Sequence, residues 1–166
     1  MKVCVSVCGR FHAFNLAQQL QKRGYLQKLI STYPAFAITK YGIDQKLIHS
    51  LWQLEALSRG WYKLPRWMRG DRNLQLWFLE QFDRSVTNYL SPEFDLFVGW
   101  SGSNYWSVHR AKELGAKTII ERGSSHMHYQ TEILTEEYEK WGLSFTETHP
   151  GIYEREIQAY DDADRI

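Results

Sequence analysis

The sequence predicts an α/β fold in which an open, parallel β-sheet carries helices on both faces. Short β-branched and apolar runs alternate with helical patterns along most of the 166 residues, which is typical of this architecture. The first strand, helix and strand fit into about 33 residues, the size of a βαβ unit with parallel strands. The length suits one domain that can bury a sizeable core.

The opening unit is predicted from residue pattern and from the residues that end each element. Residues 2–8 form a β-branched, apolar run and are expected to be a strand. Residues 13–23 carry apolar side chains at helical spacing, and Gly24 marks the end of that helix. Residues 25–34 return to strand character.

Residues 35–90 are expected to form a helical excursion that is rich in aromatic and basic residues. An amphipathic helix is predicted over residues 48–55, from Ile48 to Glu55. The next stretch, residues 59–72, carries Gly60, Pro65 and Gly70. A longer helix is predicted over 73–90.

The alternation resumes after Ser91-Pro92. Residues 94–100 predict a buried strand, 103–115 a helix, and 116–122 another strand. Residues 148–166 begin as a turn, become a helix, and end in a segment that resembles the start of one more strand.

The composition is that of a soluble globular protein, with 43% hydrophobic and 23% charged residues. No apolar run approaches the ~18–20 residues of a membrane span, and the N-terminus lacks the pattern of a secretory signal. Cys4 and Cys8 are expected on one face of the first strand, roughly 13 Å apart and too distant for a disulfide. Reduced thiols indicate a cytoplasmic location.

The net charge of +1 is unevenly distributed along the chain. Residues 1–90 contain 13 Lys/Arg and 5 Asp/Glu, whereas residues 91–166 contain 7 and 14. This asymmetry fits either an anionic partner for the first half or mutual neutralisation of the two halves in the fold.

Three loops, here called the rim loops, are rich in glycine or small hydroxyl residues: Gly9 to His12, Ser101 to Asn104, and Gly123 to His126. Each follows a predicted strand. In an open parallel sheet, ligands bind outside the carboxyl ends of the strands, so these loops are expected to meet there. Each also leads towards a helix, whose first amides favour an anion. The candidate binding residues are Gly9, Arg10, Phe11, His12, Ser101, Gly102, Ser103, Asn104, Glu121, Arg122, Gly123, Ser124, Ser125 and His126.

The basic side chains of the rim loops suit a phosphate, a carboxylate or a polyhydroxylated ligand. Glu121 can accept hydrogen bonds from sugar hydroxyls, and Arg122 can donate to phosphate oxygens. The alternatives are that Glu121 and Arg122 form a local ion pair, that Ser101 or Ser103 caps its helix, and that His126 is a solvent-exposed or helix-capping imidazole.

The same loops are also compatible with two other kinds of site. The run GWSGS (99–103) approaches the G-x-S-x-G nucleophile elbow, which would make Ser101 the nucleophile of a serine hydrolase, although no acid is clearly placed. His126 and His128, with Glu121 and Glu132, offer metal ligands without a supporting motif. The first loop is not G-x-G-x-x-G, so a dinucleotide fingerprint is absent.

The stretch RGWYKLPRWMRGDR (59–72) interleaves tryptophans with basic residues. Indoles favour the headgroup zone and cations favour anionic lipids, so peripheral membrane contact is one interpretation. Stacking on nucleic-acid bases is a second, and an excursion packed by its own aromatics is a third. Nucleic acid is not expected as the partner, because the second half is acidic and no such motif occurs.

Four segments resemble the N-terminal, acceptor-side half of family-4 glycosyltransferases, particularly bacterial ones: GRFHAFNLAQQLQKRGY, FDLFVGWSGSNYW, TIIERGSSH and EREIQAYDDADRI. The resemblance implies a Rossmann-like domain that forms half of a GT-B fold. It implies transfer from a nucleotide-sugar to a sugar or lipid-linked acceptor at the cytoplasmic face of a membrane. No tightly bound cofactor and no metal are implied.

Residue roles also follow from the resemblance. Gly9 matches a small loop near the donor phosphates, and the family's histidine beyond a later strand falls on Arg122 or His126, the two candidate catalytic residues. The family continues into a donor domain, which we expect to be absent from this chain, so the isolated chain is expected to be inactive. A stand-alone module that binds a small anion or nucleotide is the alternative.

Overall fold

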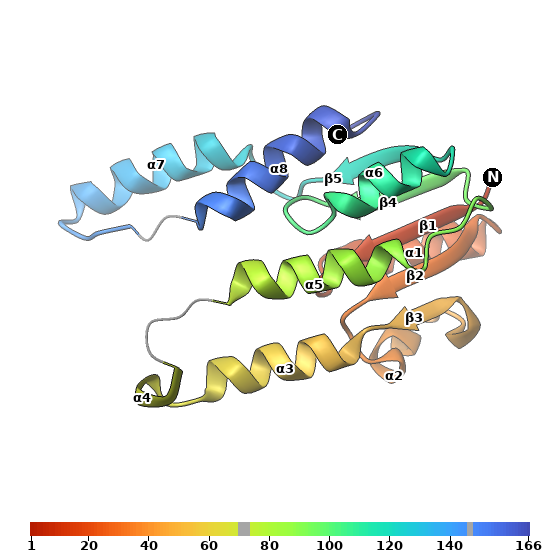
Figure 1. The fold of residues 1–166 in the computed structure, drawn as a ribbon, viewed down its shortest axis with the longest axis horizontal. Helices are drawn as coiled ribbons and strands as arrows, with labels where there is room; N and C mark the ends of the chain where they lie inside the picture. Colours follow the sequence, from red (N-terminus) through yellow and green to blue (C-terminus); the bar gives the residue numbers. More distant parts are fainter. Residues whose placement is uncertain (70–73, 146–147) are drawn as a thin grey trace.

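The computed structural model describes residues 1–69, 74–145 and 148–166 (Figure 1). In chain order the strands and helices, including two 3-10 helices (η), are β1 Val3–Val7, α1 Ala13–Lys22, β2 Leu26–Ser31, α2 Ala35–Ile38, η1 Thr39–Tyr41, η2 Gln45–Leu47, β3 Ile48–Ser50, α3 Trp52–Lys63, α4 Arg66–Arg69, α5 Gln75–Thr87, β4 Leu96–Trp100, α6 Trp106–Glu113, β5 Lys117–Glu121, α7 Met127–Lys140 and α8 Pro150–Asp162.

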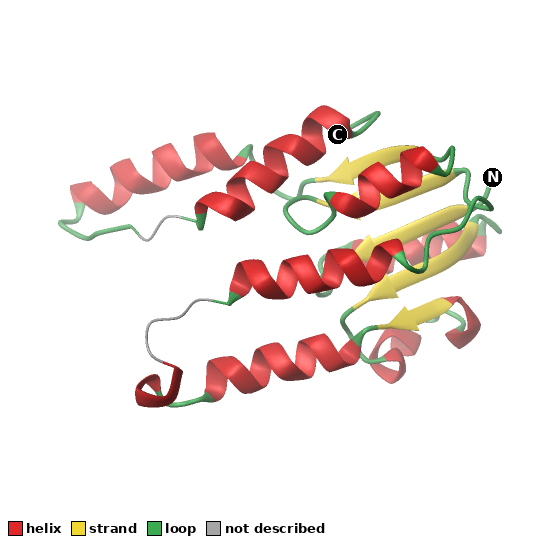
Figure 2. Ribbon diagram, in the orientation of Figure 1, coloured by secondary structure: helices red, strands yellow, loops and turns green. Residues whose placement is uncertain are grey.

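The five strands form one sheet in the order β3-β2-β1-β4-β5, and every pair is parallel. This is the order of the first five strands of the Rossmann fold. Arg165 adds an isolated parallel bridge to Ile119 beyond β5, where the sequence predicts the start of another strand. The expected α/β fold with an open parallel sheet is confirmed (Figure 2).

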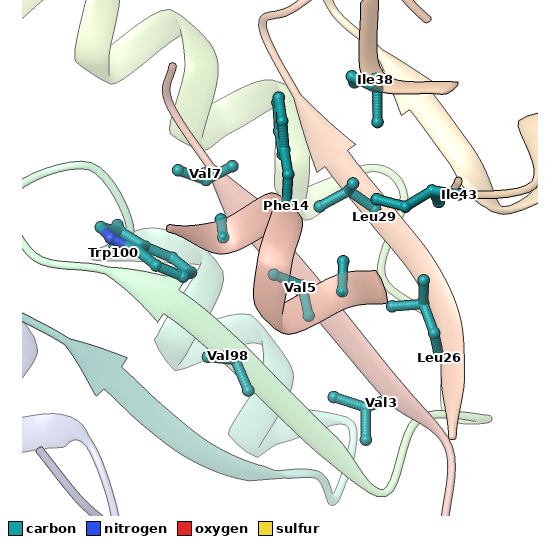
Figure 3. Packing of buried hydrophobic residues seen from close by; sticks show 12 residues of the cluster. Val3, Val5, Val7, Phe14, Leu26, Leu29, Ile38, Ile43, Val98 and Trp100 are labelled. Carbon is teal, nitrogen blue, oxygen red and sulfur yellow. The ribbon is translucent and has the colours of Figure 1, made fainter. Parts of the chain in front are cut away.

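Strand residues alternate between two cores, one on each face of the sheet. On one face, Val3, Val5 and Val7 pack with α1, which places Phe14 against Leu29 (Figure 3). On the other face, Cys4 packs with residues of α5, α6 and α8. Because successive side chains of a strand point to opposite faces, the continuous apolar run of β1 is buried on both.

One expected element is wrong in part. The sequence pattern predicts a helix over residues 48–55, but Ile48–Ser50 form the edge strand β3 and α3 begins at Trp52. The backbone of β2 offers an unpaired edge, and Ile48 pairs with Leu29 there. Tertiary pairing therefore overrides a short apolar pattern that fits both structures.

The other predicted helices and strands are present with shifted ends. The helix expected over 73–90 is α5, and Asn73, together with Gly70 and Arg72 of the aromatic and basic stretch, lies outside the described residues. No helix in the described part of the chain is long and apolar enough to cross a membrane. Cys4 and Cys8 are free thiols, as expected.

Candidate functional site

The three rim loops meet at the carboxyl edge of the sheet, because they follow the adjacent parallel strands β1, β4 and β5. The amide of Ser101 donates to the Glu121 carbonyl over 3.0 Å. From the first loop, His12 Nε2 lies 3.4 Å from Glu121 Oε2. The juxtaposition predicted from the sequence is therefore present.

A cavity of about 530 Å³ opens at this edge. Its floor includes Phe11, Ser101 to Ser103 and Ser124 from the rim loops, and Arg122 just after β5. Its walls come from α3, α5, α7 and α8, which project beyond the strand ends (Figure 1). The walls carry apolar side chains, which include Phe78, Leu79, Met127, Leu134 and Ile152, alternating with polar ones such as Gln75 and Thr131. The cavity therefore joins a polar floor to partly apolar walls.

The guanidinium of Arg122 is fixed by four partners on the cavity floor. Nε donates to the Ser125 carbonyl over 3.0 Å, and Nη2 donates to Gln130 Oε1 over 3.0 Å. Nη1 donates to Glu156 Oε2 over 2.7 Å and to Ser101 Oγ over 3.1 Å. The Arg122 side chain is 17% exposed. Its charge is thus held in one orientation at the cavity surface.

Glu156 is the buried anion of this site, since its side chain has no exposed surface. Oε2 accepts from Arg122 and from the Ser101 hydroxyl, and Oε1 accepts from the Tyr160 hydroxyl over 3.0 Å. Burial, more than the nearby carboxylate, raises the pKa of Tyr160. Tyr160 therefore stays protonated and remains a donor, and the carboxylate is paired on every side.

Ser101 does not have the surroundings of a hydrolase nucleophile. Its hydroxyl contacts Glu156, Arg122 and Tyr160. No histidine among the described residues hydrogen-bonds to it. The arrangement favours hydrogen bonding to a ligand over nucleophilic attack.

Ser103 and Asn104 hold the second loop in shape. Asn104 has no exposed surface; its amide oxygen accepts from the Trp100 amide over 2.8 Å, and its nitrogen donates to Ser6 and Ser107 over 2.9 Å each. Ser103 donates to the Trp100 carbonyl over 3.0 Å. Asn104 therefore has no free donor for a ligand, whereas Gly102 lines the cavity beside it.

The first loop divides between two sides of the rim. Phe11, with a positive φ of 41°, lines the cavity. Arg10 turns away and donates to the Tyr41 hydroxyl over 3.1 Å. His12 lies against Trp100, with ring centroids 5.1 Å apart, and pairs with Glu121. Glu121 and Arg122 therefore point to different partners and do not form the local ion pair considered above.

His126 is an exposed residue at the start of α7. Its Nδ1 accepts from the His128 amide over 3.2 Å and so caps the helix. Its ring centroid lies 5.7 Å from that of Tyr160, which places the imidazole beside the polar floor. His128 pairs instead with Glu132. Across residues 1–69, 74–145 and 148–166, no group of three or more His, Cys, Asp or Glu side chains could hold a metal ion.

Cys8 also lines the cavity. Burial, with a smaller contribution from the Glu55 carboxylate, raises the pKa of this thiol to about 12. The thiol is therefore protonated at neutral pH and is a poor nucleophile.

Sequence reasoning identified Arg122 but missed its partners Glu156 and Gln130, and it missed Tyr160, which donates to Glu156. One signal was available for Glu156. It lies on the apolar face of α8 with Ile152 and Ala159, and a carboxylate on such a face needs a cationic partner inside the fold.

The fold and the site define a class of protein: a Rossmann-like α/β domain with a ligand cavity at the carboxyl edge of its sheet. Comparison of the chain with family models, with curated proteins and with solved structures found no match. The case for a particular activity therefore depends on the geometry and on the local resemblance described above.

Proposed function

We propose that this chain is the acceptor-side domain of a glycosyltransferase that moves a sugar from a nucleotide-sugar to an acceptor. The observation that carries the proposal is the cavity, whose floor presents Ser101 and Arg122, with Arg122 held by the buried Glu156, beneath partly apolar walls. A sugar hydroxyl needs donors and acceptors of this kind, and an apolar tail on a lipid-linked acceptor needs walls of this kind.

In this proposal, the residues act by positioning and by charge. Arg122 stabilises negative charge that develops on the leaving phosphate as the anomeric carbon–oxygen bond breaks. Ser101 and the rim-loop amides orient the acceptor hydroxyl that attacks that carbon, and the proton of this hydroxyl passes to the departing phosphate oxygen. His126 borders the reacting sugar. A donor domain supplies most of the contacts to the nucleotide. Cys4 and Cys8, both free, support a cytoplasmic location, and the resemblance supports a bacterial origin.

The test is transfer of a labelled sugar by the chain joined to a donor domain of a family-4 glycosyltransferase, with water-soluble and lipid-linked acceptors. Glu156→Gln keeps the Arg122 guanidinium and should retain turnover within about tenfold. Adding Arg122→Met to that variant should lower turnover about 100-fold, as for loss of one charge-stabilising donor. His126→Ala should also lower turnover.

Arg110→Met is the matched control, because Arg110 pairs with Glu113 on the surface of α6. Equal turnover by the Glu156→Gln single variant and the Arg122→Met, Glu156→Gln double variant would show that Arg122 takes no part in the mechanism. No transfer with any acceptor by a folded fusion would remove the proposal.

The alternative is a stand-alone binding module, which the same cavity could serve. Calorimetry on the chain alone separates the two, because micromolar affinity for a nucleotide without a donor domain favours the module. Labelling of Ser101 by an active-serine phosphonate would instead favour the hydrolase.

A further inference from the structure

An apolar groove between α3 and α5 is not used by the proposed function. Its volume is about 780 Å³, and its lining includes Trp52, Leu57, Trp61, Leu64, Leu74 and Trp77. Three of these side chains are exposed: Trp52, Leu57 and Trp77. A contiguous apolar patch of this kind is unfavourable in water and marks an interaction surface.

Along the chain α3 is followed by α4, which lies at the far end of the helices that project from the sheet (Figure 1). There Trp67 is 83% exposed and Met68 is 53% exposed. Exposing a large apolar side chain to water is unfavourable relative to burying it. Indole rings favour the zone between lipid headgroups and acyl chains, where the ring is apolar and the N–H group is solvated.

The same segment is strongly basic. Residues 59–69 contain Arg59, Lys63, Arg66 and Arg69 and no acidic residue. Arg59 forms an ion pair with Glu55 over 2.8 Å, and Lys63 and Arg66 are exposed. Clustered cations of this kind are attracted to the negative potential of an anionic lipid surface.

We propose that the α3–α4 face, defined by the groove residues above together with Lys63, Arg66, Trp67 and Met68, binds the surface of an anionic lipid bilayer. Cations meet the headgroup phosphates, while the tryptophans, leucines and Met68 enter the apolar boundary. The groove borders the cavity at the sheet edge through Phe78, but its other lining residues are not those of the cavity. The inference therefore does not depend on sugar transfer.

The chemistry of the face distinguishes a bilayer from other occupants. A nucleic acid offers bases for Trp67 to stack on but no apolar partner for Leu57, Leu64 and Met68. A second copy of the chain across a two-fold axis would bring the same cations together, because such an interface joins one patch to itself. A bilayer satisfies both the apolar groove and the cations around it.

The end of α7 provides a matched control at the same end of the molecule (Figure 1). Trp141 there is 79% exposed, nearly as much as Trp67. Its neighbours on α7 include Glu136, Glu137 and Glu139, and an anionic bilayer repels such a cluster. We therefore expect Trp141 to contribute nothing to binding.

The experiment is co-sedimentation of the full chain with vesicles of phosphatidylcholine alone or mixed with phosphatidylglycerol, at low and high salt. Binding is expected only to the mixed vesicles and should weaken with salt. Trp67→Ser should lower the partition coefficient about tenfold. Lys63→Gln and Arg66→Gln should each lower it about fivefold. Trp141→Ser should leave it unchanged.

Three results would overturn the proposal. One is the absence of sedimentation with mixed vesicles by a chain that circular dichroism shows to be folded. Another is an equal decrease of the vesicle partition coefficient in the Trp67→Ser and Trp141→Ser variants. The third is release of the bound chain from the vesicles when single-stranded RNA is added or when the chain associates with itself. Either result would show that the α3–α4 face binds a different partner.

Discussion

At the scale of single residues, Arg122 and Glu156 depend on each other for their burial. Removing the guanidinium leaves a fully buried carboxylate without its cation. We expect Arg122→Ala to lower the free energy of unfolding by about 3 kcal/mol, the cost of breaking a buried ion pair from one side. Urea denaturation followed by circular dichroism measures this loss.

The double variant Arg122→Met, Glu156→Gln is the control for that loss. Glutamine at 156 keeps an acceptor for the Tyr160 hydroxyl and carries no charge. The unfolding free energy of the double variant should lie within about 1 kcal/mol of that of the unmodified chain, since an apolar or neutral replacement of a buried ion pair is often tolerated. Equal destabilisation of the single and double variants would show that Glu156 does not depend on Arg122.

The two residues differ in how far the sequence predicts them. Arg122 follows a strand whose apolar run has ended, so its place at the rim is predictable. Glu156 lies 34 residues further along the chain, in a helix whose packing against β4 and β5 no local pattern specifies. The hydrogen bond between Arg10 and Tyr41 could not be predicted either, because only the fold brings the two side chains together.

At the scale of elements, the turn after β4 depends on a glycine inside the strand. A Cβ at Gly99 would lie 2.7 Å from Asn104 Cβ, the residue that fixes this turn. We expect Gly99→Ala to destabilise the fold by about 1–3 kcal/mol through overpacking. It should also displace Ser101 from the cavity floor. Thermal and urea denaturation measure the first effect.

Gly60 is the matched control, because it lies in the interior of α3 with no heavy atom within 4 Å of a built Cβ. Gly60→Ala should raise the unfolding free energy by about 0.5–1 kcal/mol through helix propensity. Equal changes in the unfolding free energy of the Gly99→Ala and Gly60→Ala variants would contradict the role assigned to Gly99 in the β4 turn.

The segment after α8 is attached to β5 by Asp164, and this attachment depends on pH. Its carboxylate accepts from the Thr118 amide and hydroxyl, each over 2.9 Å, and from Lys117 over 3.1 Å. Chiefly the Thr118 amide lowers the pKa of Asp164 to about 2. A lowered pKa stabilises the fold above the ordinary pKa near 4, and the stabilisation disappears as pH falls through about 2.

We therefore expect Asp164→Asn to destabilise the chain at pH 7, and the difference from the unmodified chain to shrink as pH falls from 4 towards 2. Unfolding free energies across that range give the result. A difference that stays constant, or grows on acidification, would contradict the assigned cause.

At the scale of the whole molecule, the sheet was predictable and the walls of the cavity were not. Strand-and-helix alternation with right-handed crossovers allows few topologies, so the meeting of the rim loops follows from the order of the elements. The walls of the cavity depend on how far α3, α5, α7 and α8 extend beyond the sheet and on the angles between them. Tertiary packing determines both, and no local sequence pattern specifies it. The edge strand β3 was missed for the related reason that its pairing with β2 is not local.

If the proposed function is right, a sugar-bearing ligand binds in the cavity above Arg122. The direct measurement is methyl NMR of the chain during titration with a soluble alkyl glycoside below its micelle concentration. We expect shifts of the Met127, Leu134 and Ile152 methyl groups, and we expect these shifts to be lost in the Arg122→Met, Glu156→Gln variant. Shifts confined to Leu57 and Leu64 in the groove, or no shifts in the millimolar range, would contradict it.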